Sequence, residues 1–156
     1  MSAEEIKGDQ TCLTSKKFVY TAKAYTTGGR DGGVSRTSDG RLAVQLSTPG
    51  GTGNGTNPEQ LFAVGWSACF LSAIKIIAGK KRIKLPDDIA IDIEIDLGID
   101  HGVHGLAARL NIMLPGMVHE DAQTLAEGAH LICPYSRATH GNIDVVTSVI
   151  TAEVLQ

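Results

Sequence analysis

Apolar and polar residues alternate in several short stretches of the chain, which is the pattern of a strand that buries one face. The clearest run is 89–97, in which four isoleucines and Leu97 alternate with alanine and acidic residues. Further strands are predicted over residues 18–25, 34–38, 41–47, 106–114 and 144–154. Asp39-Gly40 separates two of these stretches and signals a two-residue turn, so the chain is expected to open as an antiparallel meander.

Two longer segments have helical patterns. The first begins at Asn57-Pro58-Glu59, with an N-cap residue, proline in the first position and acid in the first turn, and is expected to reach about Ile77. Its body carries one charge, Lys75, so nearly every side must be covered, but it is too short and too rich in small residues for a membrane span. The second helix is predicted over 120–132 and ends before Cys133-Pro134.

This order of elements predicts an α+β fold with about six strands and two long helices. A length of 156 residues suits one domain, which we expect over 18–156 after a flexible polar tail at 1–17 that holds Cys12. The net charge of −3 gives no basic field for nucleic acid. Three cysteines and no apolar leader favour a cytoplasmic protein with reduced thiols and no membrane contact.

The candidate chemistry lies with Cys69, inside the first helix, and Cys133, at the end of the second. Either cysteine alone is more often a small buried packing residue. A reactive thiol needs a lowered pKa, and Cys69 is about three turns from the helix N-terminus, too far for the dipole to act. Arg30, in a glycine-rich loop, is the candidate cation, and Glu59 could hold it; otherwise both are ordinary solvated residues.

Histidines offer weaker alternatives. His101 and His104 are three residues apart without an evident third ligand, so no metal site is expected. His130 and Cys133 have the spacing of one helical turn, which suits a Cys–His nucleophile pair, but Pro134 and the terminal position argue against hydrolase chemistry. We therefore expect surface histidines at both places.

Four motifs stand out along the chain: Asn57-Pro58-Glu59-Gln60-Leu61, Gly65-Trp66-Ser67-Ala68-Cys69-Phe70, Cys133-Pro134-Tyr135-Ser136 and Gly141-Asn142. Together they resemble the organic hydroperoxide resistance (Ohr) family of the OsmC-like proteins. The resemblance spans about 18–154. The family often has tyrosine where this chain has Trp66, and the sister OsmC branch remains an alternative that the Cys-Pro-Tyr-Ser motif disfavours.

The resemblance implies an OsmC-like fold, with antiparallel sheets around two long helices in an intertwined homodimer. It implies a thiol-dependent peroxidase of oxidative-stress defence that acts on organic hydroperoxides without metal or cofactor and is reset by a dithiol of the lipoyl type. Carried over by motif, Cys69 is the peroxidatic thiol, Cys133 the resolving thiol, and Arg30 with Glu59 the activating pair. The apolar surroundings of Cys69 suit an alkyl tail, with pocket candidates Phe62, Trp66 and Phe70.

One geometric difficulty follows from the helix. Glu59 and Cys69 are ten residues apart, or about 15 Å along a straight helix, so one guanidinium cannot contact both. We therefore expect sites that straddle the subunit interface of a dimer. Two other functions remain open: a dimeric binding protein for a small apolar ligand, with packing cysteines, and a redox sensor that forms the same disulfide without rapid turnover.

Overall fold

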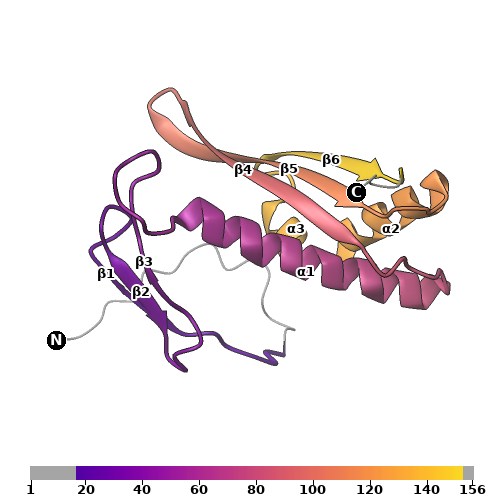
Figure 1. The fold of residues 1–156 in the computed structure, drawn as a ribbon, viewed down its shortest axis with the longest axis horizontal. Helices are drawn as coiled ribbons and strands as arrows, with labels where there is room; N and C mark the ends of the chain where they lie inside the picture. The colour runs from indigo at the N-terminus through magenta and orange to yellow at the C-terminus, as the bar shows by residue number, and fades with distance from the viewer. Residues whose placement is uncertain (1–16, 153–156) are drawn as a thin grey trace.

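The structure is a computed structural model that describes residues 17–152, so nearly all of the expected tail, including Cys12, lies outside the described residues. This range contains six strands and three helices, whose arrangement is drawn in Figure 1. In chain order they are β1 Ala24–Thr27, β2 Val34–Thr37, β3 Ala43–Gln45, α1 Pro58–Lys81, β4 Ala90–Asp100, β5 Val103–Met113, α2 His119–Ile132, α3 Pro134–Thr139 and β6 Asp144–Ile150. The α+β class and the order of the predicted elements are confirmed, with α3 as an additional short helix.

The first three strands form a small antiparallel sheet at the N-terminal end of α1 (Figure 1). The expected strand over 18–25 begins only at Ala24, and Phe18, Val19 and Tyr20 are exposed. Strand geometry needs a hydrogen-bonded neighbour, and before Ala24 one ladder contact is present, from Ser38 N–H to the Lys23 carbonyl. The alternating pattern therefore predicted a longer strand, with an earlier start, than the structure contains.

The larger sheet has the order β4-β5-β6. Strands β4 and β5 pair antiparallel across a tight turn in which His101 and Gly102 both have positive φ, as a two-residue hairpin turn of this kind requires. Strands β5 and β6 pair in parallel, which differs from the all-antiparallel expectation. The cause is the crossover through α2 and α3, which brings the chain back beside the first half of β5, so β6 runs in the same direction as β5.

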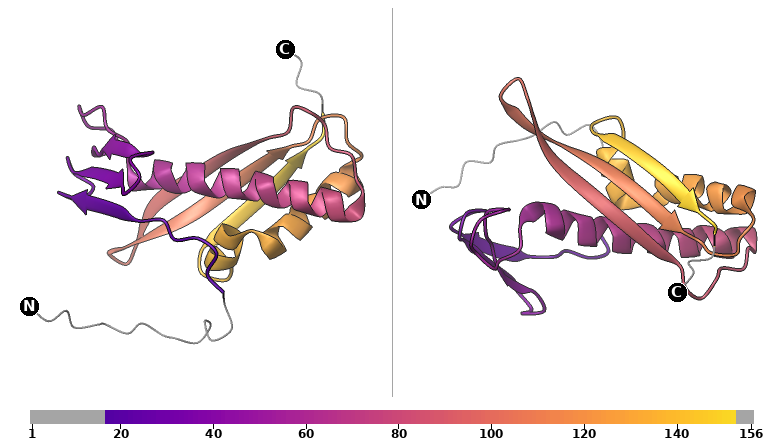
Figure 2. Two further views of the ribbon diagram at one scale, coloured as in Figure 1. Left: turned by 90° about the horizontal axis from the view of Figure 1, so that it is seen from below. Right: turned by 45° about the horizontal axis from the view of Figure 1, so that its top comes forward.

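Both long helices lie on one face of this sheet, as the two views of Figure 2 show. The core between the layers contains large side chains that are fully buried: Trp66, Phe70 and Ile74 from α1, Leu110 and Ile112 from β5, and Leu125 from α2. Helices α1 and α2 approach closely because Gly128 has no side chain; a Cβ there would lie 2.9 Å from Ile77 Cγ2. This packing fixes the positions of the helix segments that carry the cysteines.

Helix α1 starts as the sequence indicates, with the Asn57 side chain accepting from Gln60 N–H at 2.9 Å. It continues to Lys81 rather than Ile77 and stops where Arg82 adopts a left-handed conformation. At 24 residues, α1 has the length and composition of a membrane-crossing helix, contrary to the sequence-based expectation. Its contacts with α2, β4 and α3 make it the central helix of this fold.

One chain leaves several apolar side chains uncovered. Val64 and Ile76 on α1 are 68% and 52% exposed, and Ile99 and Val103 near the tip of the β4–β5 hairpin are about as exposed. The hairpin tip extends beyond the N-terminal end of α1 (Figure 1). Within the described residues, the requirement that α1 be covered on nearly all sides is therefore unmet.

Candidate active site

The structure brings Cys69 and Cys133 together. Cys69 lies on α1, and Cys133 occupies the junction between α2 and α3, where it ends one helix and precedes the other. Both are free thiols, Cys133 fully buried and Cys69 partly buried. The two thiols lie close enough for Cys133 to affect the ionisation of Cys69, and the backbone N–H of Tyr135 is close enough to stabilise a Cys69 thiolate. Two cysteines far apart in the sequence thus meet at one point between the helices.

This environment does not favour a thiolate at Cys69 within one chain. Burial raises the pKa of the Cys69 thiol, and the neighbouring Cys133 raises it further. The Tyr135 N–H acts in the opposite direction by stabilising the thiolate, but it is the weaker influence. The groups that set this pKa in the described chain do not include Arg30, so a positive charge must reach Cys69 in another way to activate it.

Arg30 pairs instead with Glu59. Its Nη2 donates to Glu59 Oε1 at 2.5 Å, and this hydrogen bond raises the pKa of Arg30. The loop that contains Arg30 folds so tightly that a Cβ at Gly33 would lie 2.2 Å from the Gly29 carbonyl oxygen, so glycine is required at position 33. The pairing that the sequence suggested is therefore present, at the N-terminal end of α1.

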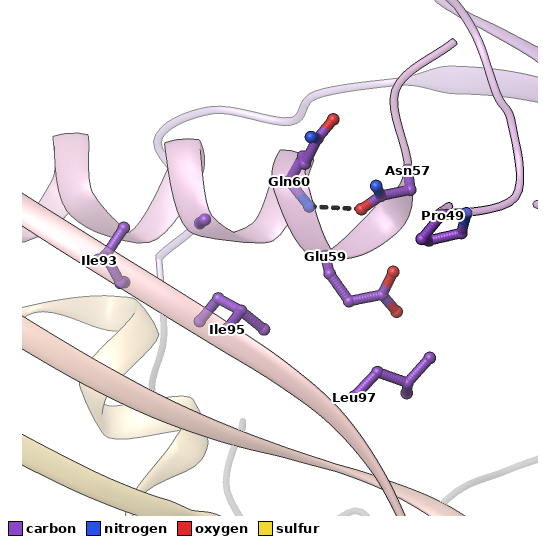
Figure 3. Close-up of a pocket in the computed structure, with 8 residues that line it drawn as sticks. Pro49, Asn57, Glu59, Gln60, Ile93, Ile95 and Leu97 are labelled. Atoms are coloured by element: carbon purple, nitrogen blue, oxygen red, sulfur yellow. Dashed lines mark hydrogen bonds between the residues drawn. The ribbon is translucent and has the colours of Figure 1, made fainter. Parts of the chain in front are cut away.

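Glu59 points into a hollow of about 460 Å³ between the start of α1 and strand β4 (Figure 3). Ile93, Ile95 and Leu97 line its other side. The second carboxylate oxygen, Glu59 Oε2, is buried and has no hydrogen-bond partner among the described residues. A buried carboxylate oxygen without a donor is energetically costly.

The ion pair and the thiols belong to different parts of one chain. Helix α1 is continuous from Pro58 to Lys81, so Glu59 and Cys69 are separated by about 15 Å along its axis, as expected from the sequence.

Aromatic side chains surround the cysteines unequally. Trp66 and Phe70 are fully buried core residues, whereas Phe62 is partly exposed and packs against Trp66 and Tyr135 at centroid distances of 5.4 and 5.7 Å. Tyr135 was not selected from the sequence as a site residue. Its ring covers Gly65, where a Cβ would lie 2.5 Å from the hydroxyl oxygen. Its place between Cys133 and Ser136 in the second cysteine motif was the available signal.

The histidine expectations had mixed outcomes. His101 is exposed on the β4–β5 turn, as expected. His130 is not a surface residue: it is half-buried and hydrogen-bonded through both ring nitrogens, to Ser136 and Thr147. The sequence-based expectation was wrong there because α3 and β6 both fold over the end of α2.

Comparison with known proteins agrees with this architecture. Residues 51–148 match the family model described as OsmC-like protein. An organic hydroperoxide resistance protein of Xanthomonas axonopodis pv. citri is 48% identical over 134 residues, covering 83% of this chain and 94% of that protein. An organic hydroperoxide resistance protein structure from Legionella pneumophila superposes with a TM-score of 0.80 at 40% identity, covering 86% of this chain and 99% of that one.

OhrB of Bacillus subtilis has a similar fold, with a TM-score of 0.76 at 34% identity, and covers 85% of this chain and 99% of that one. The fold and the family model define an OsmC-like protein. Within that class, the chain belongs to the organic hydroperoxide resistance (Ohr) family.

Proposed function

We propose that this protein is a cysteine-based peroxidase that reduces organic hydroperoxides to alcohols in oxidative-stress defence. The observation that carries this function is the contact between the free thiols of Cys69 and Cys133, one partly exposed and the other enclosed. The relatives described as organic hydroperoxide resistance proteins support the substrate class.

Three steps complete the cycle. The Cys69 thiolate attacks one peroxide oxygen, the O–O bond breaks, and the departing alkoxide takes a proton to leave as the alcohol, so Cys69 becomes a sulfenic acid. Cys133 then attacks the Cys69 sulfur, a disulfide forms, and the hydroxyl leaves as water. A dithiol, for which we propose a lipoyl group, reduces this disulfide by exchange and becomes a cyclic disulfide itself.

The activating charge comes from a second subunit in this proposal. Arg30 and Glu59 of one protomer approach Cys69 of the partner subunit in a homodimer. Three observations support this arrangement: the pKa of Cys69 is raised in a single chain, Glu59 Oε2 is buried without a donor, and apolar side chains of α1 and the hairpin are uncovered. The Arg30 guanidinium would stabilise both the thiolate and the charge that develops on the leaving oxygen.

The alkyl part of the substrate binds against apolar surface beside Cys69. We assign the exposed wall to Phe62, with Trp66 and Phe70 as the enclosed layer behind it. Such a surface favours an alkyl hydroperoxide over hydrogen peroxide. The chemistry needs no metal or cofactor, and we propose the cytoplasm as the compartment because thiols are kept reduced there.

Mass spectrometry after one equivalent of cumene hydroperoxide tests this function. We expect the protein to lose two hydrogens within one chain, with cumyl alcohol released in equal amount. Cys133→Ser should instead gain one oxygen at Cys69, and Cys12→Ser should behave like the unmodified protein. An unchanged mass would identify a ligand-binding protein, and disulfide formation without turnover with dihydrolipoamide would identify a redox sensor. Either result overturns the peroxidase assignment.

A further inference from the structure

A chain of hydrogen-bonded side chains joins α1, which carries Cys69, to α2 and α3, which meet at Cys133, and two of its members, His130 and Ser136, have no part in the proposed chemistry. Trp66 Nε1 on α1 donates to Ser136 Oγ on α3 at 3.1 Å, and His130 Nδ1 on α2 lies 3.1 Å from the same oxygen. On its other side, His130 Nε2 lies 2.8 Å from Thr147 Oγ1 on β6. We call His130, Ser136 and Trp66 the histidine clamp.

The clamp lies one turn away from the thiol pair. Cys69 follows Trp66 by three residues on α1, and Cys133 follows His130 by three residues along α2. Residues at this spacing are neighbours on one helix face. The Trp66–Ser136–His130 contacts and the Cys69–Cys133 contact are therefore adjacent links between α1 and the region where α2 and α3 meet, so the first can set the geometry of the second.

The donors and acceptors fix the protonation state of the clamp. An indole N–H can only donate, so Ser136 Oγ accepts from Trp66. Ser136 is buried, and the one acceptor that its own hydroxyl hydrogen meets among the described residues is His130 Nδ1. That bond requires an unprotonated Nδ1, so the tautomer that satisfies every group of the clamp has its proton on Nε2, which donates to Thr147 Oγ1.

We infer that His130 is a positioning residue whose neutral form, through Ser136 and Trp66, holds Cys133 where it can react with the Cys69 sulfenic acid. This inference rests on the proposed function. It makes the rate of the second step, disulfide formation, depend on the protonation state of His130. Protonation of Nδ1 turns an acceptor into a donor, which leaves the buried Ser136 hydroxyl hydrogen without a partner. Disulfide formation therefore slows in acid, while the attack of Cys69 on peroxide does not depend on the clamp.

The surroundings favour the neutral ring at physiological pH. Burial lowers the pKa of His130, and the nearby His140, after α3, lowers it further. His119 and Glu127 of α2 line the hollow beside the imidazole, and Cys133 follows one turn along. The elements that pack across it contribute non-titrating groups, Phe70 from α1 and Thr147 and Val149 from β6.

The tautomer can be tested on the reduced protein without any reaction. Long-range ¹H–¹⁵N correlation spectra distinguish protonated from unprotonated ring nitrogens, and the His130→Asn spectrum assigns the His130 signals by their absence. We expect the Nε2–H tautomer at neutral pH. A proton on Nδ1 at neutral pH would overturn the inference whatever the protein does with peroxides.

A competition experiment tests the effect on chemistry. The protein reacts with one equivalent of cumene hydroperoxide in the presence of dimedone, and mass spectrometry gives the ratio of disulfide to dimedone adduct at Cys69. His130→Asn retains a hydrogen-bond acceptor and cannot titrate, and His101→Asn is the matched control at an exposed histidine. Dividing the wild-type ratio by the variant ratio at each pH cancels the pH dependence of the trap.

For His130→Asn, we expect this quotient to fall about five-fold or more from neutral to acidic pH. A change of about five-fold corresponds to the lowest free-energy cost of leaving a buried hydroxyl hydrogen without an acceptor. For His101→Asn it should stay near one. A quotient for His130→Asn that is independent of pH overturns the positioning role. If neither disulfide nor adduct forms at any pH, the peroxidase function itself fails, and the spectra still decide the tautomer.

Discussion

Arg30 Nη2 lies 2.5 Å from Glu59 Oε1, whereas the thiol that this ion pair is proposed to activate lies ten residues further along the same helix. A straight α1 cannot bring the two together within one chain. In the proposed homodimer, the ion pair at the N-terminal end of α1 therefore activates Cys69 of the partner subunit and not Cys69 of its own chain.

Mixing two inactive variants provides a direct test of shared sites. Arg30→Ala lacks the cation and Cys69→Ser lacks the thiol, so each homodimer should be inactive. If the sites straddle the interface, a heterodimer formed by co-refolding regains one complete site, with Cys69 from one chain and Arg30 from the other. We expect peroxidase turnover to recover to about half the wild-type rate per heterodimer, since one of two sites is intact. Activity that stays absent in a verified heterodimer would place both groups in one chain.

The thiol pKa provides a second test. Burial is the largest cause that raises the pKa of Cys69 in a single chain, and it persists when Cys133 is replaced, so Arg30→Ala should leave the pKa above the ordinary value of about 8.5. With Arg30 present in the dimer, the pKa should fall below that value, which increases the thiolate fraction at neutral pH. Ultraviolet thiolate absorbance measures this in a Cys12→Ser, Cys133→Ser background. Arg41→Ala, at an exposed arginine, should leave the titration unchanged.

Helix packing predicts opposite effects of two glycine substitutions. Gly79→Ala in α1 meets no atom within 4 Å and should stabilise the protein by about 1 kcal/mol through helix propensity. Gly128→Ala in α2 would place its Cβ 2.9 Å from Ile77 Cγ2, and overpacking costs about 1–3 kcal/mol. Urea unfolding should show Gly128→Ala to be less stable than Gly79→Ala by at least about 1 kcal/mol. Equal stabilities would mean that α1 and α2 move apart without cost to accommodate the added methyl group.

His130 predicts how stability depends on pH. Its pKa is lowered in the folded protein, first by burial and then by His140, so the unfolded chain binds a proton at higher pH than the native protein does. Its contribution to stability is complete above about pH 6.5 and is lost as the pH falls through the folded-state value. His130→Asn should flatten this part of the profile in urea titrations. His101→Asn, at an exposed position, should keep the wild-type slope.

The sequence was most informative where local physics decides the structure. Asn57 and Pro58 determine the start of α1 in isolation, and the isoleucine alternation from Ile89 identifies β4 without reference to a partner. The approach of Arg30 to Glu59 and the meeting of Cys69 with Cys133 followed from chemistry combined with family motifs. These two contacts join distant parts of the chain, so they came from the motifs, whereas the helix start and the strand required no knowledge of which elements pack together.

The features that were missed depend on packing. The parallel pairing of β5 with β6 depends on the path of the crossover, and the short helix α3 has too few residues to carry a periodic signal. His130 looks like a surface residue on an amphipathic helix until α3 and β6 enclose it, so its hydrogen bonds to Ser136 and Thr147 had no signature in the chain.

In the proposed cycle, the different burial of the two cysteines determines which sulfur of the disulfide the reductant attacks. Cys133 has no accessible surface, whereas Cys69 retains some. An incoming thiolate can therefore collide only with the Cys69 side of the disulfide, so the reductant becomes joined to Cys69 and Cys133 departs as the leaving group. The Cys133 sulfur therefore needs no contact with the reductant, and the accessibility of the Cys69 sulfur alone determines how fast the dithiol form is regenerated.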